Sequence, residues 1–174
     1  MAIMIPTSVS VFDDAAVLAL QRSNPAWRLE LSADGVVIAS PLTGTATGPK
    51  EGEAFLQLAA WSRAAGGKAF PASTGFRLPD KSVRGPDAAW ISTERLSRLE
   101  ASAKRSAFWS VCPDVVIEIM SEWDTWAELR DKIDLYARNG ASYAVAVDCG
   151  IPNRYERGVA PPGLQLDFAA ICAA

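Results

Sequence analysis

The sequence contains no histidine among its 174 residues. This absence excludes a Ser-His-Asp or Cys-His catalytic set, an imidazole general base and the usual histidine ligands of zinc. Any acid–base or metal chemistry therefore has to come from carboxylates, lysine, tyrosine or water.

Cysteine is also scarce. Cys112, Cys149 and Cys172 are widely spaced, and no Cys-x-x-Cys pair occurs. This spacing indicates neither a zinc site nor a disulfide framework. We expect three buried thiols in a protein of a reducing compartment.

Long apolar runs are missing as well, since none approaches the roughly 20 residues of a membrane-spanning helix. Residues 1–6 lack the basic region and apolar core of a signal peptide. We therefore expect a cytoplasmic protein without membrane contact, folded as one domain over residues 1–174. Its net charge of −3 offers no general attraction to a polyanion, so a nucleic-acid binder of this composition needs a basic patch or a metal ion.

The hydrophobic pattern predicts helices mixed with short strands. Helical spacing occurs over residues 12–22, 51–65, 93–99 and 124–139. Strand-like pieces occur at residues 27–31, 36–39, 68–70, 74–78 and 87–91. Asp34-Gly35 supplies a hairpin turn between the first two strands, and residues 100–106 are either a loop or the end of the preceding helix. Asp124 is the expected N-cap of the last helix, and Gly140 its C-terminal stop.

The segment 114–120 gives the strongest strand signal, because its apolar run suits a central strand covered on both faces. The helix 124–139 follows it, and residues 143–147 form another buried strand. Strand, helix and strand in this order imply a right-handed crossover and a parallel pair. We predict an α/β (α+β) fold in which a mixed sheet is flanked by helices.

Glu118 interrupts the apolar run of the segment 114–120. In strand geometry it shares a face with Val116 and Met120. A buried carboxylate has to meet a cation, a metal ion or a proton, because leaving it unpaired is costly. A structural ion pair with Arg77 or Lys132 is one interpretation, and a functional site is the other.

Two further residues are candidates for the same site. Asp87 lies at the entrance to the strand 87–91, where a turn or capping role also explains it. Lys132 lies at the rim of the apolar face of its helix, so its ammonium can either reach the strand ends or pair with Glu128 one turn earlier. Two carboxylates on neighbouring strands can hold one Mg²⁺, and a lysine beside them can stabilise a phosphoryl transition state.

Four segments resemble the bacterial Uma-two family of restriction endonucleases, which have a PD-(D/E)XK-type core. They are residues 73–80, 85–90, 113–121 and 129–141. The similarity reaches back to Leu29-Glu30-Leu31 and Asp34-Gly35 and covers residues 10 to 150. It implies a restriction-endonuclease-like mixed sheet with an added N-terminal helix and β-hairpin.

The resemblance also assigns roles to individual residues. Asp87 is implied to be the motif aspartate and Glu118 the motif glutamate. Met120 stands where a PD-(D/E)XK lysine would be, and Lys132 matches the lysine that this family places on the following helix. The backbone carbonyl of Ile119 is the implied third metal ligand. The implied cofactor is Mg²⁺, with Mn²⁺ as a possible substitute.

The function implied by the resemblance is a Mg²⁺-dependent endonuclease that hydrolyses DNA phosphodiester bonds. Ser121 matches a family position where it hydrogen-bonds near the site. The chain departs from the family after residue 143, where residues 144–149 lack the usual tryptophan and the following strands are shortened to residues 153–158.

Two other functions remain open from the sequence alone. One is a catalytically silent nuclease-like module that binds nucleic acid or a protein partner. The other is a structural homodimer or larger homo-oligomer in which Trp123 and Trp126 pack at an interface, although these rings could equally pack against their own sheet.

Overall fold

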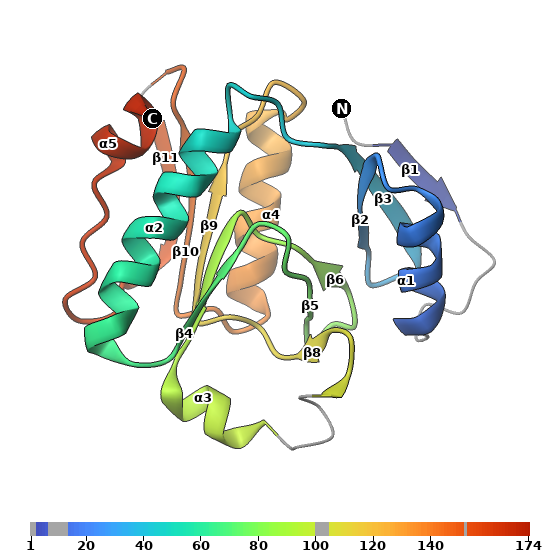
Figure 1. Ribbon diagram of the computed structural model, residues 1–174, viewed down its shortest axis with the longest axis horizontal. Helices are drawn as coiled ribbons and strands as arrows, with labels where there is room; N and C mark the ends of the chain where they lie inside the picture. The colour runs from blue at the N-terminus through green and yellow to red at the C-terminus, as the bar shows by residue number, and fades with distance from the viewer. Residues whose placement is uncertain (1–2, 7–13, 100–104, 152) are drawn as a thin grey trace.

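The computed structural model describes residues 3–6, 14–99, 105–151 and 153–174, and its framework consists of two β-sheets (Figure 1). In spatial order, the six-stranded sheet contains β1 (Ile3–Pro6), β3 (Val36–Pro41), β2 (Trp27–Leu31), β6 (Val83–Arg84), β5 (Phe76–Arg77) and β8 (Trp109–Ser110). The five-stranded sheet contains β11 (Asn153–Gly158), β10 (Tyr143–Asp148), β9 (Val115–Ile119), β7 (Ala88–Ile91) and β4 (Lys68–Pro71). The helices are α1 (Asp14–Ser23), α2 (Gly48–Ala65), α3 (Thr93–Arg98), α4 (Trp126–Arg138) and α5 (Phe168–Ala173).

Strand β9 lies at the centre of the five-stranded sheet, parallel to β10 and antiparallel to β7. Helices α2 and α5 cover one face of this sheet and α4 covers the other (Figure 1). Ile117 packs in the core on the α2 side, whereas Val116 packs with Ile133 and Tyr136 of α4. The predicted parallel pair, the buried central strand and the mixed sheet flanked by helices are confirmed.

The N-terminal part adds a helix and a β-hairpin, as predicted. Strands β2 and β3 pair in antiparallel register, and Gly35 in their turn has a φ of 93°, which suits glycine. Val17 of α1 packs with Leu31, Val37 and Val83 in a small core of its own. The predicted first residues of α1, and most of the segment 100–106, lie outside the described residues.

The start of α4 differs from the prediction. Thr125 is the N-cap: its hydroxyl accepts a hydrogen bond from the Glu128 backbone, and the Glu128 carboxylate accepts one from the Thr125 backbone. The predicted cap, Asp124, is wrong, since its carboxylate instead accepts the backbone and hydroxyl hydrogen bonds of Ser121. A Thr-x-x-Glu capping box satisfies two donors reciprocally, which a lone aspartate cannot do. Gly140 follows the end of α4 in a positive-φ conformation, as predicted.

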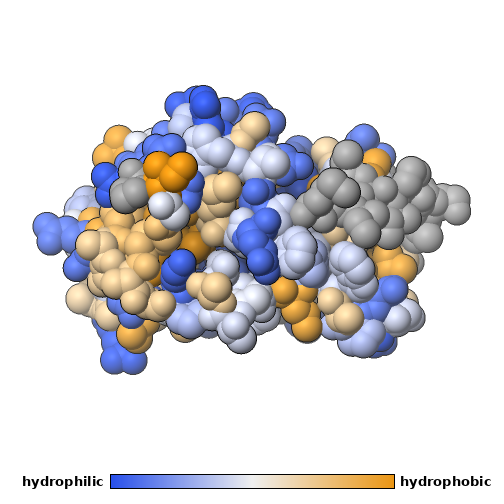
Figure 2. Space-filling view, turned by 90° about the horizontal axis from the view of Figure 1, so that it is seen from above, coloured by the Kyte–Doolittle hydropathy of each residue, from blue (hydrophilic) through white to orange (hydrophobic). Residues whose placement is uncertain are grey.

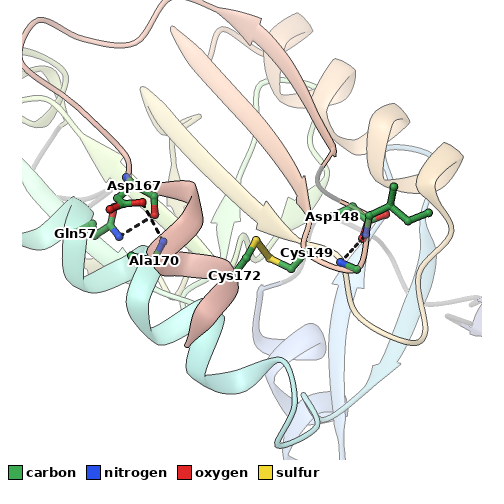
Figure 3. Close-up of a disulfide and its surroundings, with 8 residues drawn as sticks. Gln57, Asp148, Cys149, Asp167, Ala170 and Cys172 are labelled. Atoms are coloured by element: carbon green, nitrogen blue, oxygen red, sulfur yellow. Dashed lines mark hydrogen bonds between the residues drawn. A yellow bond between two sulfur atoms is a disulfide. The ribbon is translucent and has the colours of Figure 1, made fainter.

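Strand β1 and helix α5 were not predicted from the sequence. The Asp167 carboxylate caps α5 by accepting a hydrogen bond from the Ala170 backbone (Figure 3). Gln57 of α2 then holds both backbone groups of Asp167, at 2.8 and 3.2 Å. These contacts dock α5 against α2. In the described part of the chain, no helix is long and apolar enough to span a membrane.

A disulfide joins Cys149, at the end of β10, to Cys172 of α5 (Figure 3). The prediction of three free thiols is therefore wrong for these two residues and correct for Cys112, which is buried and free. The two bonded cysteines are 23 residues apart, and only the return of the C-terminal segment along α2 brings them together. The spacing of the cysteines in the sequence therefore could not predict this pairing.

Candidate active site

The pairing of β7 with β9 brings Asp87 opposite Glu118. Ala88 pairs with Ile117 in antiparallel register, so the next position along each strand sets Asp87 against Glu118. Both carboxylates are buried, and the Ile119 backbone donates a hydrogen bond of 2.8 Å to Asp87 Oδ2. Two carboxylates predicted on neighbouring strands thus lie together at the same end of β9.

Lys132 reaches the same place from α4. Its Nζ lies 2.9 Å from Glu118 Oε1 and 3.3 Å from Glu30 Oε1. Of the two cations considered for Glu118, Lys132 is the partner, whereas Arg77 pairs with Asp14 of α1. The Lys132–Glu128 pair is not formed, because Glu128 belongs to the capping box of α4.

Asp87, Glu118 and Lys132 line a cavity of about 460 Å³ between α4 and the β2–β3 hairpin. Ile119 and Ser121 also contribute to its wall. Seen from above, the molecule is hydrophilic across its middle, and its apolar surface gathers over the half that carries α5 (Figure 2).

Two residues of β2 complete the site and were missed by the sequence reasoning. Arg28 donates a hydrogen bond of 2.8 Å to the Gly85 carbonyl, and Glu30 accepts one of 2.8 Å from the Gly85 N–H. Arg84 also donates to Glu30, at 3.2 Å. We call this arrangement the Gly85 clamp: Arg28 and Glu30 of β2 holding both backbone groups of Gly85. It fixes the turn from which Asp87 enters β7.

Alternation along β2 is the signal that could have identified the clamp. Positions 28 and 30 share one face of the strand, while Leu29 and Leu31 point to the other. Polar residues on one face of a hairpin usually face water, so the alternation alone gave no reason to place Arg28 and Glu30 at a site.

Glu51, in the first turn of α2, is a further carboxylate of the cavity that was not predicted. Its Oε1 accepts a hydrogen bond of 3.0 Å from the Thr43 hydroxyl and lies 3.9 Å from Arg28 Nη1. Its side chain is only 12% exposed, so the cavity holds a fourth largely buried carboxylate.

The two carboxylate partners of Lys132 have pKa values that are shifted in opposite directions. Burial opposes ionisation of Glu30, but the Lys132 ammonium and the Arg84 guanidinium overcome this and hold its pKa at about 2. Burial raises the pKa of Glu118 to about 8; Lys132 opposes the rise, and the charge of Asp87 adds to it. Burial also disfavours the charged form of Lys132, yet Glu118 and Glu30 raise its pKa, so the ammonium persists at neutral pH.

Two further carboxyl groups of the cavity, those of Asp87 and Glu51, also have raised pKa values. Burial raises the pKa of Asp87, against the opposing charges of Arg28 and Lys132. Burial, together with the charge of Asp87, raises the pKa of Glu51 to about 7. Several carboxyl groups with raised pKa values in one cavity are typical of a functional site, because a fold seldom concentrates this cost without a use for it.

The donor set fits Mg²⁺. Among the described residues, no three side chains of His, Cys, Asp or Glu gather into a metal cluster. Mg²⁺ nevertheless needs only one or two protein carboxylates, since it keeps several of its waters. Asp87 and Glu118 supply two, and Glu118 Oε1 is buried with no hydrogen bond within the described residues, although the Lys132 ammonium lies near it.

Comparisons with known proteins agree with this fold. A crystal structure described as that of "a putative nuclease belonging to DUF820" from Anabaena variabilis matches with a TM-score of 0.66 and 15% identity, over 83% of this chain and 89% of that chain. At this identity the match shows the fold alone. No curated protein matches the chain. A family model described as "Uma2: Putative restriction endonuclease" matches residues 14–160. Since that match spans most of the sequence, the chain belongs to the Uma2 family.

Proposed function

We propose that this protein is a cytoplasmic, Mg²⁺-dependent endonuclease that hydrolyses phosphodiester bonds of DNA. One observation carries the proposal: Asp87 and Glu118 face each other across neighbouring strands, with the Lys132 ammonium 2.9 Å from Glu118, in one cavity. Membership of a family of restriction endonucleases supports a nuclease as the class of enzyme. The metal and the DNA substrate are our proposal.

Each residue has a proposed role. Asp87, Glu118 and the Ile119 backbone carbonyl would hold Mg²⁺, which when bound activates water and neutralises charge on the phosphoryl group. Lys132 stays protonated and donates hydrogen bonds to a phosphoryl oxygen, where negative charge develops during hydrolysis. Glu30 remains ionised and holds the Lys132 ammonium on its other side, so that the lysine does not swing away from Glu118.

The cavity lining explains why a metal ion would be required before nucleic acid can bind. Its carboxylates are Glu30, Glu51, Asp87, Glu118, Asp124, Glu128 and Asp131. Its cations are Arg28, Arg84, Lys132 and Arg138. When all of these carboxyl groups are ionised they outnumber the cations, so a phosphodiester then meets net repulsion until a divalent ion reverses the local charge.

Cleavage of a supercoiled plasmid in Mg²⁺ or Mn²⁺ tests the proposal. The wild-type protein should nick or linearise the DNA, and Asp87→Asn should lower the rate by at least about 100-fold while leaving the fold intact. Asp134→Asn is a matched control, because Asp134 lies on α4 outside this cavity and pairs with Arg157. Equal cleavage by wild type and Asp87→Asn would rule out the site.

The acidic lining also favours a second candidate, a nuclease-like module that binds a partner without cleaving nucleic acid. Such a module needs no metal ion at Asp87 and Glu118. Calorimetric titration with Mg²⁺ separates the two: binding lost in Asp87→Asn supports the nuclease, whereas no metal binding supports the silent module.

A further inference from the structure

The Arg28 guanidinium lies between two carboxylates of the cavity. Its Nη1 is 3.3 Å from Asp87 Oδ1, 3.9 Å from Glu51 Oε1 and 3.5 Å from the Thr43 hydroxyl. Its Nη2 donates separately to the Gly85 carbonyl, at 2.8 Å. The side chain is 30% exposed and borders the cavity, so it is accessible to a ligand that enters there.

This contact uses the Asp87 oxygen that a metal ion would need. Asp87 Oδ2 already accepts the Ile119 N–H, and Oδ1 faces the guanidinium. A divalent ion that binds Oδ1 therefore meets a positive charge a few ångströms away, and such like charges repel strongly in a partly buried site. Either the ion binds weakly, or Arg28 Nη1 has to release Asp87.

The anchoring of Arg28 allows such a release without loss of the side chain from the cavity. Nη2 stays on the Gly85 carbonyl, and that bond does not involve Asp87. Nη1 also lies 3.5 Å from the Thr43 hydroxyl and 3.9 Å from Glu51 Oε1, so both acceptors stay within reach when it leaves Asp87. A guanidinium held through one nitrogen and released at the other presents charged N–H donors to a phosphate oxygen.

We propose that Arg28 acts as an exchangeable counter-ion: it neutralises Asp87 in the metal-free protein, yields Asp87 Oδ1 to the divalent ion, and then binds a non-bridging oxygen of the phosphodiester. This inference rests on the proposed metal site at Asp87 and Glu118. It makes Arg28 a substrate-binding residue, and it means that Arg28 occupies Asp87 Oδ1 as long as no metal ion is bound.

If Arg28 had a purely structural role, its substitution would change metal binding in the opposite direction from the one that the exchange predicts. If Arg28 only held Asp87 in place, its removal would misplace Asp87 and weaken metal binding. If Arg28 competes with the metal, its removal strengthens metal binding and weakens phosphate binding. A variant that binds the metal ion more tightly and phosphate more weakly is expected only if Arg28 exchanges between Asp87 and phosphate.

Electron paramagnetic resonance of free Mn²⁺ measures the first quantity on the full chain without nucleic acid. Arg28→Gln should bind Mn²⁺ at least about tenfold more tightly than wild type, because even moderate screening leaves a sizeable repulsion at this distance. Arg77→Gln is the matched control, since Arg77 also pairs with an aspartate but outside the cavity, and its Mn²⁺ affinity should equal that of wild type. Equal or weaker Mn²⁺ binding by Arg28→Gln would overturn the exchange.

Inorganic phosphate is the probe for the second quantity. Paramagnetic broadening of its ³¹P resonance by the Mn²⁺-loaded protein should saturate at lower phosphate concentration for wild type than for Arg28→Gln. The same saturation concentration for both proteins would overturn the role of Arg28 in phosphate binding. This experiment needs no cleavage, so a protein that binds Mn²⁺ but does not cut DNA contradicts the nuclease function and leaves the exchange supported or rejected on its own.

A third measurement needs only the wild-type protein and does not depend on how Arg28→Gln folds. Arginine side chains labelled with ¹⁵N give Nε–H resonances, and Arg28→Lys identifies that of Arg28 by its loss. Titration with diamagnetic Mg²⁺ should shift this resonance and leave that of Arg77 in place. An Arg28 resonance that does not respond at saturating Mg²⁺ contradicts the proposal.

Discussion

The ammonium of Lys132 lies 2.9 Å from the carboxylate of Glu118, although one residue belongs to a helix and the other to the central strand of the sheet. The family resemblance implies that a strand-borne lysine would stand at position 120, and this chain has Met120 there. The lysine that meets the glutamate therefore comes from α4, and the depth at which α4 packs on β9 sets the distance between them.

Removal of Lys132 should abolish most of the activity without preventing metal binding. Lys132→Ala loses the charge that stabilises the phosphoryl oxygens, so cleavage at saturating Mg²⁺ should fall by about 10²–10³-fold. Lys68→Ala is the control, because Lys68 is exposed on β4 and lies outside the cavity lining. Comparable rates for Lys132→Ala and wild type would show that the lysine has no part in hydrolysis.

The stability of the metal-free protein should fall as pH rises through the folded-state pKa of Glu118. That pKa is about 8, above the value of 4.5 for an unperturbed glutamate, because burial and Asp87 disfavour the charge while Lys132 only partly offsets them. A raised carboxyl pKa means that the folded state holds the proton more tightly, so this contribution is complete below about pH 4.5 and is lost as pH rises through about 8.

Glu118→Gln tests this dependence, because glutamine does not ionise. In the presence of a chelator, the free energy of unfolding of the variant relative to wild type should increase between about pH 5.5 and about pH 8.5, as measured by urea denaturation. Glu30 stays ionised over this range and Glu51 titrates in both proteins, so both largely cancel from the difference, which reports Glu118 together with its neighbour Asp87. A difference that does not change with pH would contradict the raised pKa.

The disulfide should contribute to the stability of the C-terminal part of the fold. Cys149→Ser opens the link between β10 and α5, and loss of a cross-link over a loop of this size should lower the free energy of unfolding by about 2–4 kcal/mol. A reducing agent should destabilise wild type to a similar extent and leave Cys149→Ser unchanged. Cys112→Ala, which removes the free thiol, should still respond to the reducing agent; a response in Cys149→Ser instead would contradict the assigned pairing.

Trp123 should contribute to nucleic-acid binding. It lines the cavity and is 45% exposed, and stacking of a base on an aromatic ring is worth about 1–3 kcal/mol. Trp123→Ala should weaken oligonucleotide binding in Mg²⁺, measured by fluorescence anisotropy, and change the free energy of unfolding by less than about 0.5 kcal/mol. Ile151→Ala removes an exposed apolar residue that does not line the cavity and should leave binding unaffected.

The same variant examines the alternative in which Trp123 belongs to a homodimer interface. Sedimentation would then show that Trp123→Ala dissociates a wild-type dimer, with oligonucleotide affinity per chain unchanged. Trp126, the other ring considered for that interface, is half-buried and packs on the core beneath α4.

Sequence periodicity predicted the central strand, the hairpin and the main helices because each is encoded by neighbouring residues. Glu118 stood out for the same reason, as a carboxylate within an apolar run. Asp87 and Lys132 had ordinary local explanations, and only the family resemblance linked them to Glu118. The structure brings all three together, and their catalytic roles stay a prediction.

Contacts between distant segments account for what the sequence did not reveal. The sequence did not assign Arg28 and Glu30 to the site, since their partner Gly85 is more than fifty residues away. The Cys149–Cys172 bond and the Gln57–Asp167 contact likewise depend on how α5 docks against distant parts of the chain. The prediction of the N-cap of α4 was wrong for a different reason. Asp124 and Thr125 are both good cap residues, and the reciprocal hydrogen bonds between Thr125 and Glu128 favour Thr125.

The Gly85 clamp has a consequence for how the site is assembled. Both of its bonds close loops of more than fifty residues, and closing such loops costs chain entropy before any contact compensates for it. The five-stranded sheet does not include β2, so we expect the β2–β3 hairpin to open locally while that sheet stays folded. A brief detachment of the hairpin would leave the sheet folded and remove Arg28 and Glu30 from the site together. Hydrogen exchange at the Gly85 amide therefore reports how often the five-stranded sheet is folded while the site lacks Arg28 and Glu30.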